Sequence, residues 1–342
     1  MLNNKSCTEN RRYPFFDYIK GFAILLIIIT HYEYTYFERL HVVFPYVVDM
    51  AVPIFMLVTG FLYSNSYIKK DFKTLKEMYC PDLMIKRILR LIIPVLIIFT
   101  LMYILNNANL RTNGEFFAAL FNGKYGPGSY YIPVILQIVL IFPFIHLLLI
   151  KYKSIGFAII LFIEFIYMLL AVKFNINSIL FRSLAFRFLT LLSMGSILAI
   201  YRPNIKDKYL LLSLFIGASC IFVNYYTVYK YFTYPYIPQY WGLTSGFVTM
   251  LYIFPIFYWF YEYFINKEYN NCFTKLISII GKASWHIFLV QMFYFLAIDT
   301  HLYKILPPVL HVITNILVCT TAGIVFYLTE NRIKFLLFKN KI

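Results

Sequence analysis

The chain has 342 residues, of which 61% are hydrophobic and only 13% are charged, and its mean hydropathy is +0.71. Soluble domains carry about twice that share of charged residues, so these values exclude an ordinary soluble protein. The formal net charge of +16 does not imply a nucleic-acid partner, because most of the basic excess lies in loops predicted to face the cytoplasm.

Apolar runs long enough to cross a bilayer recur along the whole chain without alternating apolar and polar residues. We therefore expect an all-α fold, a polytopic membrane helix bundle. Residues 1–342 are predicted to form a single membrane domain with ten spans. In chain order, the predicted spans are Tyr18–Phe37, Val42–Tyr63, Ile88–Leu105, Ser129–Ile150, Ile155–Val172, Ile179–Tyr201, Tyr209–Tyr229, Leu243–Phe264, Leu276–Ile298 and Ile305–Leu328.

The connections between these spans alternate in their content of lysine and arginine. The N-terminal tail and every second connection after it hold 20 of these residues, whereas the five intervening loops hold 6. By the positive-inside rule both termini are predicted to face the cytoplasm, in a multi-pass protein of the cell membrane. The most basic loop, Lys69–Arg87, is expected to favour anionic lipid headgroups, although a polyanionic cofactor such as coenzyme A is an alternative ligand.

The first predicted span carries three ionisable residues, Asp17, Lys20 and His31. In a regular helix Lys20 and His31 share one face, about 16 Å apart along the axis. Asp17 lies one turn before Lys20 and is expected to pair with it. The histidine suits a general base at neutral pH, but an interhelical hydrogen bond is the ordinary use of such a residue. Both interpretations stay open.

The second and third predicted spans add acidic and basic groups. Asp49 lies at the outer end of the second span. In the third, Lys86 and Arg90 are one turn apart and suit a clamp for phosphate or an anionic headgroup. For Lys86 and Arg87, extension of the side chain to the cytoplasmic interface is the preferred interpretation. Arg90 lies one turn deeper and is the better candidate for a ligand contact.

The sixth predicted span contains two arginines, Arg182 and Arg187. Five helical positions separate them by about 140°, so they are expected to face different neighbours. Arg187 is the deeper of the two, and its expected partner is Asp49, Glu33 or a bound anion.

Other polar residues carry weaker signals. Lys282 and His286 lie one turn apart in the ninth predicted span, whereas packing or interfacial roles are expected for His146, His301 and His311. The five cysteines show no CxxC pair, so neither a disulfide nor a zinc site is expected. The sequence also lacks Walker-type, GxGxxG, HExxH and GxSxG motifs, which argues against an ATP-driven pump or a zinc protease.

Several segments, taken in order, resemble the membrane acyltransferase-3 family, whose members O-acylate surface polysaccharides and related glycans. Lys20 and His31 are similar to its opening motif of a cation, ten residues and a histidine, with lysine in place of the usual arginine. The later segments that resemble family motifs are Val52–Leu62, Lys86–Pro94, Ser129–Ile132, Arg187–Gly195 and Ser284–Gln291, the last ending in glutamine where histidine is common.

The resemblance implies transfer of an acyl group, commonly acetyl, from acyl-CoA to a hydroxyl of a cell-surface glycan or its precursor, without a metal. It implies donor binding by Lys20, Lys86, Arg87 and Arg90, and it places Lys20 among the catalytic residues together with His31 and Arg187. His31 would then act as general base or transient acyl carrier, and Arg187 would stabilise negative charge on the reacting carbonyl oxygen. Two alternatives remain: a transporter of a glycan, lipid-linked sugar or small anion, and a non-catalytic partner in a polysaccharide synthesis complex.

Overall fold

The computed structural model describes residues 13–32, 43–105, 126–230, 246–267, 269, 271–297 and 306–338. Within these residues all regular structure is helical, which confirms the predicted all-α class. The helices are α1 Pro14–Thr30, α3 Phe44–Val47, η1 Val48–Met50, α4 Ala51–Lys69, α5 Leu75–Met78, α6 Pro81–Leu105, α8 Tyr131–Lys173, α9 Ser178–Ser183, η2 Ala185–Phe188, α10 Leu189–Tyr201, α11 Asp207–Lys230, α12 Gly246–Phe264, α13 Cys272–Lys282, α14 Ser284–Ala297 and α16 Pro308–Phe338.

Four helical stretches in the described part of the chain are long and apolar enough to cross a bilayer. They are Phe44–Lys69, Pro81–Ile104, Tyr131–Lys173 and Pro308–Leu336, and the bent pair formed by α13 and α14 adds a fifth if it is one span. The chain is therefore a multi-pass membrane protein. Each of the ten predicted spans overlaps a helix, but the count of ten and the cytoplasmic location of both termini stay predictions.

The first helix is displaced towards the N-terminus from the predicted span Tyr18–Phe37. Helix α1 begins at Pro14, because proline fits the first turn, where its missing N–H is not needed. It ends at Thr30, and His31 follows as the C-cap with φ −90° and ψ 0°. His31 therefore stands at the end of the helix and not within it. Residues 33–37 of the predicted span lie outside the described residues.

The sixth predicted span, Ile179–Tyr201, is wrong as a continuous helix. Helix α9 ends at Ser183, and Leu184 is extended, with φ −100° and ψ 134°, before the 3₁₀ helix η2 begins. The side chain of Gln137 replaces the lost helical bonds. Its Nε2 donates to the Ser183 carbonyl at 2.7 Å, and its Oε1 accepts the Ala185 N–H at 3.1 Å. A neighbouring side chain thus satisfies backbone groups that hydrocarbon would leave unpaired.

The helical geometry is interrupted at two other places, one within a predicted span and one between two predicted spans. The predicted span Leu276–Ile298 is divided at Ala283 into α13 and α14, which are bent by 69°. In α8 the break occurs at Lys153, with φ 48° and ψ −120°, within the turn expected between the fourth and fifth spans. A Cβ atom on Gly156 would lie 2.8 Å from the carbonyl carbon of Leu148. Because eight residues of straight helix span about 12 Å, the chain folds back sharply here.

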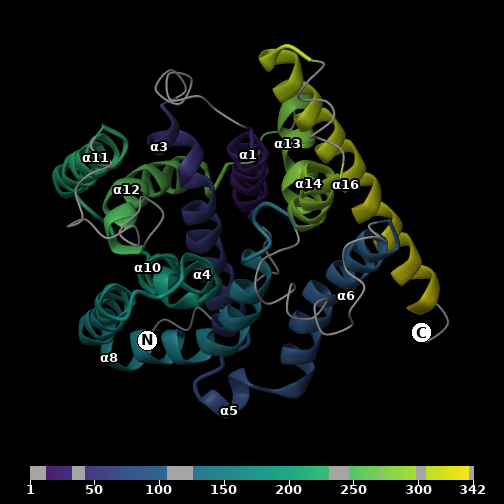
Figure 1. Ribbon diagram of the computed structural model, residues 1–342. Coiled ribbons are helices and arrows are strands. Elements are labelled where there is room, and N and C mark those ends of the chain that lie inside the picture. Colours follow the sequence, from purple (N-terminus) through teal and green to yellow (C-terminus); the bar gives the residue numbers. More distant parts are fainter. Residues whose placement is uncertain are drawn as a thin grey trace.

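Glycines let the central helices approach each other closely. Figure 1 shows α1 and α4 between a flank formed by α11 and α12 and the opposite flank formed by α6 and α16, with α10 beside α4. A Cβ atom on Gly60 of α4 would overlap the Leu192 carbonyl, and one on Gly195 of α10 would overlap the Leu57 carbonyl. Helix α8 joins this pair through His146, whose Nδ1 lies 2.8 Å from Ser64 Oγ. His146 is therefore part of the packing, as expected.

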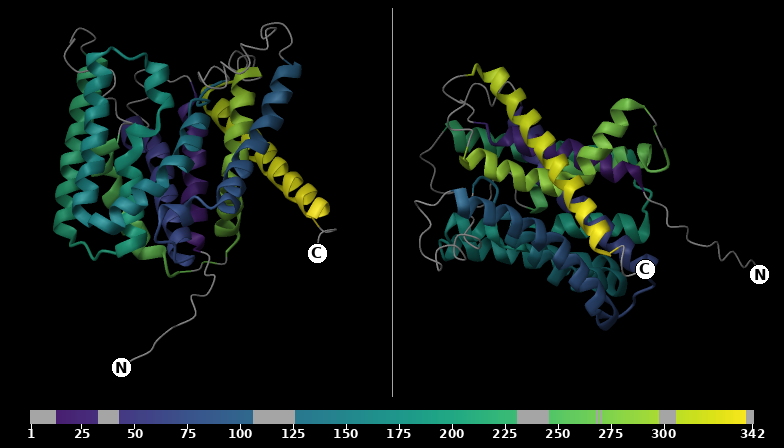
Figure 2. Two further views of the ribbon diagram at one scale, coloured as in Figure 1. Left: turned by 90° about the horizontal axis from the view of Figure 1, so that it is seen from below. Right: turned by 90° about the vertical axis from the view of Figure 1, so that its right-hand side faces the viewer.

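The last described helix is longer than predicted. Helix α16 continues to Phe338, ten residues past the predicted end at Leu328. Its C-terminal part slants away from the other helices (Figure 2). The apolar run stops at Thr329, but the polar residues that follow are compatible with helix, so hydropathy alone underestimates its length. The added turns carry Glu330 and Lys334, which belong to the candidate site.

Candidate functional site

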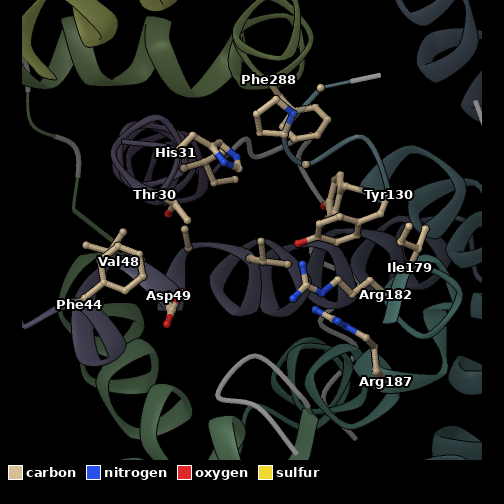
Figure 3. Close-up of a pocket in the computed structure, with 17 residues that line it drawn as sticks. Thr30, His31, Phe44, Val48, Asp49, Tyr130, Ile179, Arg182, Arg187 and Phe288 are labelled. Atoms are coloured by element: carbon tan, nitrogen blue, oxygen red, sulfur yellow. The ribbon is translucent and has the colours of Figure 1, made fainter. Parts of the chain in front are cut away.

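A cavity of about 530 Å³ lies at the C-terminal end of α1 (Figure 3). We call it the histidine cavity, and its polar lining residues include Thr30, His31, Asp49, Tyr130, Arg182 and Arg187. These residues come from four places: the end of α1, the segment before α4, the turn before α8, and the broken segment formed by α9 and η2. The cavity thus gathers His31 and Arg187, two of the three residues expected to be catalytic.

His31 is held by its position after the last turn of α1. Its backbone N–H donates to the Ile28 carbonyl at 3.3 Å, and its ring lies 5.6 Å from that of Phe295. Gly128 lies directly against the imidazole, because a Cβ atom there would be 3.5 Å from His31 Nε2. Gly128 has φ +85°, a conformation that only glycine adopts readily, so the turn before α8 can lie against the histidine.

Arg182 and Arg187 line the same cavity, contrary to the expectation that they face different neighbours. That expectation assumed one regular helix, and the break at Leu184 removes the basis for it. Figure 3 shows both guanidinium groups pointing towards the space beside Tyr130. Arg187 is only 2% exposed, and its guanidinium carbon lies 4.4 Å from the centroid of the Phe188 ring. Such cation–π packing fixes a buried guanidinium.

A buried acid stands behind Arg187. The Glu164 carboxylate accepts hydrogen bonds from the backbone N–H and the hydroxyl of Thr190, both at 2.7 Å. Asp49, one of the partners expected for Arg187, lines the histidine cavity with it. Glu33, the other acidic partner considered, lies outside the described residues. In the sequence, Glu164 is notable only as an acidic residue within an apolar run. That pattern does not predict which residues lie next to its carboxylate.

A second cavity, of about 740 Å³, lies between α1, α4, α6, α14 and α16. We call it the basic cavity. Its described lining includes five cationic side chains, Lys20, Arg87, Arg90, Lys282 and Lys334, with Glu330 as the one carboxylate. Such a concentration of positive charge in a concave, partly apolar site attracts polyanionic ligands.

The expected donor-binding residues separate into two groups. Lys20, Arg87 and Arg90 line the basic cavity, whereas Lys86 is exposed and lies outside the described lining of both cavities. The predicted pair of Asp17 with Lys20 is confirmed, with 3.0 Å between a carboxylate oxygen and Nζ. Lys86 and Arg90 therefore do not form the expected clamp at this cavity, because only Arg90 lines it.

Arg87 does not extend to the interface as the sequence suggested. Its guanidinium lies 4.2 Å from the ring centroid of Tyr63 and 4.7 Å from that of Tyr67. Nη1 also donates a hydrogen bond of 2.7 Å to the Tyr67 hydroxyl. Both tyrosines belong to α4, so this contact fastens the start of α6 to α4 and holds the cation at the wall of the basic cavity.

Sequence reasoning missed a polar network across the basic cavity. The Glu330 carboxylate contacts His286 Nε2 and also pairs with Lys334 Nζ at 2.5 Å. His286 had been noted only for its spacing from Lys282. Glu330 falls after the predicted end of the tenth span, and 44 residues separate it from His286, so no local pattern connects the two.

The two cavities adjoin through a shared apolar wall. Ile27, Tyr131 and Phe288 are lining residues of both. Lys20 and His31, which belong to different cavities, are connected along α1 with Ile27 between them. The site is therefore a pair of chambers, one rich in cations and one holding the histidine. Within the described residues, no group of three or more His, Cys, Asp or Glu side chains is placed to bind a metal ion.

A family model described as an acyltransferase domain matches residues 13–328. No curated protein and no solved structure matches the chain. The matched region contains the described lining of both cavities except Glu330, Asn331 and Lys334, which α16 adds beyond it.

Proposed function

Because the chain belongs to the membrane acyltransferase-3 family, we propose that it transfers an acyl group, with acetyl as the expected group, from acyl-CoA to a hydroxyl of a cell-surface glycan or its precursor. The observation that carries this proposal is the pair of adjoining cavities. One has the charge that a polyanionic donor requires, and the other contains a histidine suited to proton transfer.

The donor would bind in the basic cavity. Coenzyme A carries its negative charge on phosphate groups, and arginine and lysine are the side chains that bind phosphate. Arg87 and Arg90 line the wall formed by α6, with Lys20 on α1 and Lys334 on α16. With the phosphates held by these cations, the thioester would extend towards the shared wall formed by Ile27, Tyr131 and Phe288.

The reaction would take place in the histidine cavity. His31 takes the proton of the acceptor hydroxyl, and the hydroxyl oxygen attacks the thioester carbonyl carbon. The carbon–sulfur bond breaks, the acyl group becomes an ester of the acceptor, and the coenzyme leaves as a thiolate that takes up the proton held by His31, which returns the histidine to its neutral form. Arg187 is suited to stabilise the negative charge on the carbonyl oxygen, because its buried guanidinium lines the same cavity.

The proposal includes an orientation in the cell membrane. If the chain has ten spans and both termini lie in the cytoplasm, the Lys20 end of α1 and the basic cavity face the cytoplasm, where acyl-CoA is found. The histidine cavity would then receive a glycan or lipid-linked acceptor from the other side. The alternation of basic residues in the loops supports this arrangement.

The test uses membranes that contain equal amounts of the wild-type protein, His31→Gln or His146→Gln. Each sample receives acetyl-CoA labelled in the acetyl group, and the label is followed into glycan, lipid and wall fractions. We expect His31→Gln to lower transfer about 100-fold or more, the usual contribution of a general base. His146→Gln is the control, because His146 lies outside the described lining of both cavities.

Four outcomes of these measurements bear on the proposed function and on the role of His31. Label that depends on His31 supports the proposal, and equal label with both variants removes His31 from the chemistry. No transfer by wild type from any acyl donor, with the acceptor present, contradicts the transferase. Movement of a glycan or anion without acyl-CoA would instead support the transporter. The charged linings of the two cavities would also suit the path of a transported substrate.

A further inference from the structure

The wall between the two cavities contains an aromatic side chain at the point where the acyl group would pass. We propose that Phe288, held by Trp285 and Tyr131, limits the length of the acyl chain and restricts the donor to short acyl groups. This inference rests on the proposed acyltransferase function and assigns its donor specificity to one residue. Phe288 is buried, with 5% of its surface exposed, and lines both cavities.

The Phe288 ring is held on two sides. The Trp285 ring stacks on it with centroids 5.5 Å apart and an interplanar angle of 15°, and the Tyr131 ring meets it edge-on at 5.4 Å. Trp285 is itself fixed by a hydrogen bond of 3.3 Å from its Nε1 to the Leu91 carbonyl of α6. Offset stacks and edge-on pairs are the favoured aromatic geometries, so the ring resists displacement.

The same ring lies close to the histidine. A Cβ atom on Gly128 would be 3.2 Å from Phe288 Cε2 and 3.5 Å from His31 Nε2. The edge of the phenyl ring and the imidazole therefore both border one small volume beside Gly128. An acyl carbonyl that comes within reach of an acceptor hydroxyl at His31 must pass the Phe288 ring.

The surroundings of this volume disfavour a long chain. Beyond Phe288 the histidine cavity is lined partly by apolar and partly by charged side chains, among them Arg182 and Arg187, and it must also hold the acceptor. A methylene next to these charged groups gains little of the favourable free energy that burial in an apolar pocket provides. The phenyl ring occupies the apolar space next to Ile27 and Trp285 in which added methylenes would be favourable. Removing the ring should open that space.

The experiment supplies acetyl-, butyryl- and hexanoyl-CoA to membranes that contain the full chain and its acceptor, with kcat/KM measured for each donor. We expect wild type to prefer acetyl-CoA, and Phe288→Ala to raise the hexanoyl-to-acetyl ratio at least 10-fold, since each methylene in an apolar pocket discriminates by about 10-fold or more. Phe288→Trp, which places a larger ring in the wall, should lower the butyryl-to-acetyl ratio. Phe293→Ala is the matched control, because Phe293 lies on the same helix but outside the described lining of both cavities.

The outcomes separate this inference from the function on which it rests. A wild-type preference for hexanoyl-CoA, or an unchanged ratio in folded Phe288→Ala, overturns the inference while the transferase stands. The absence of acyl transfer by wild type from all three donors overturns the proposed function itself. If Phe288→Ala fails to fold, Phe288→Leu provides the same comparison with more apolar bulk retained, and a ratio equal to that of wild type again overturns the inference.

Discussion

Adjacent basic residues at the start of α6 serve different purposes in the structure. Lys86 is exposed, whereas the guanidinium of Arg87 lies against the rings of Tyr63 and Tyr67 and donates a hydrogen bond to the Tyr67 hydroxyl. A planar guanidinium can stack on a ring and donate a directed hydrogen bond at the same time, which an ammonium group cannot. The identity of residue 87 therefore matters beyond its charge.

We predict that Arg87→Lys destabilises the protein although it keeps the charge. Loss of the charged hydrogen bond to Tyr67 and of the ring contacts is expected to cost about 1–3 kcal/mol. The measurement is the apparent melting temperature in detergent. Lys86→Gln is the control and should leave the melting temperature close to that of wild type, because an exposed substitution usually changes stability by less than about 0.5 kcal/mol. Equal shifts for the two variants would contradict the structural role of Arg87.

At the scale of elements, the sequence predicted the presence and order of the helices better than their continuity. Apolar runs of sufficient length locate the helices that overlap the ten predicted spans, because hydropathy reports burial in hydrocarbon. The breaks at Leu184 and Ala283 leave hydropathy unchanged, since a bent apolar segment has the same composition as a straight one. The break at Leu184 is made possible by Gln137, which comes from another helix and 46 residues away from Ser183.

In the candidate site, too, the sequence identified individual residues better than their arrangement in space. The motif of Lys20 and His31 identified α1 as important, and Arg90 and Arg187 were singled out because charge is costly in hydrocarbon. Contacts between distant helices bring His31 and Arg187 to one cavity, and other such contacts bring Lys20 and Arg90 to the second cavity. Periodicity within one helix cannot predict these groupings.

The close contact of α4 with α10 leads to a prediction at the element scale. A side chain at Gly195 would overlap the Leu57 carbonyl, so Gly195→Leu must push the two helices apart. Overpacking of this kind typically costs about 1–3 kcal/mol and should lower both the yield of folded protein and its melting temperature. Ser219→Leu, at an exposed position of α11, adds apolar volume without such an overlap and serves as the control. Equal stability of the two variants would show that α4 and α10 do not pack through Gly195.

At the scale of the whole molecule, the predicted topology places the turns after α4 and after α8 on opposite sides of the membrane. Three predicted spans separate the two turns, which are marked by the exposed residues Lys73, between α4 and α5, and Lys173, the last residue of α8. In a chain whose five cysteines are replaced by serine, we expect an impermeant maleimide to label Lys173→Cys in intact cells. Lys73→Cys should react only after lysis. Labelling of both positions from the outside would contradict the predicted number of spans, and the reverse pattern would invert the orientation.

The wall of Ile27, Tyr131 and Phe288 has an electrical consequence if the two cavities open to opposite faces of the bilayer. Water and ions in the cavities would conduct, so the membrane potential would fall across this short wall and not across the full hydrocarbon thickness of about 30 Å. Moving one elementary charge through that field involves about 2.3 kcal/mol per 100 mV. The acyl group leaves the thioester as a formal cation, so its transfer moves no net charge through that field when the proton that His31 takes from the acceptor crosses to the leaving thiolate, while the phosphates of the donor stay on one side. Such a protein can acylate its acceptor without discharging the membrane.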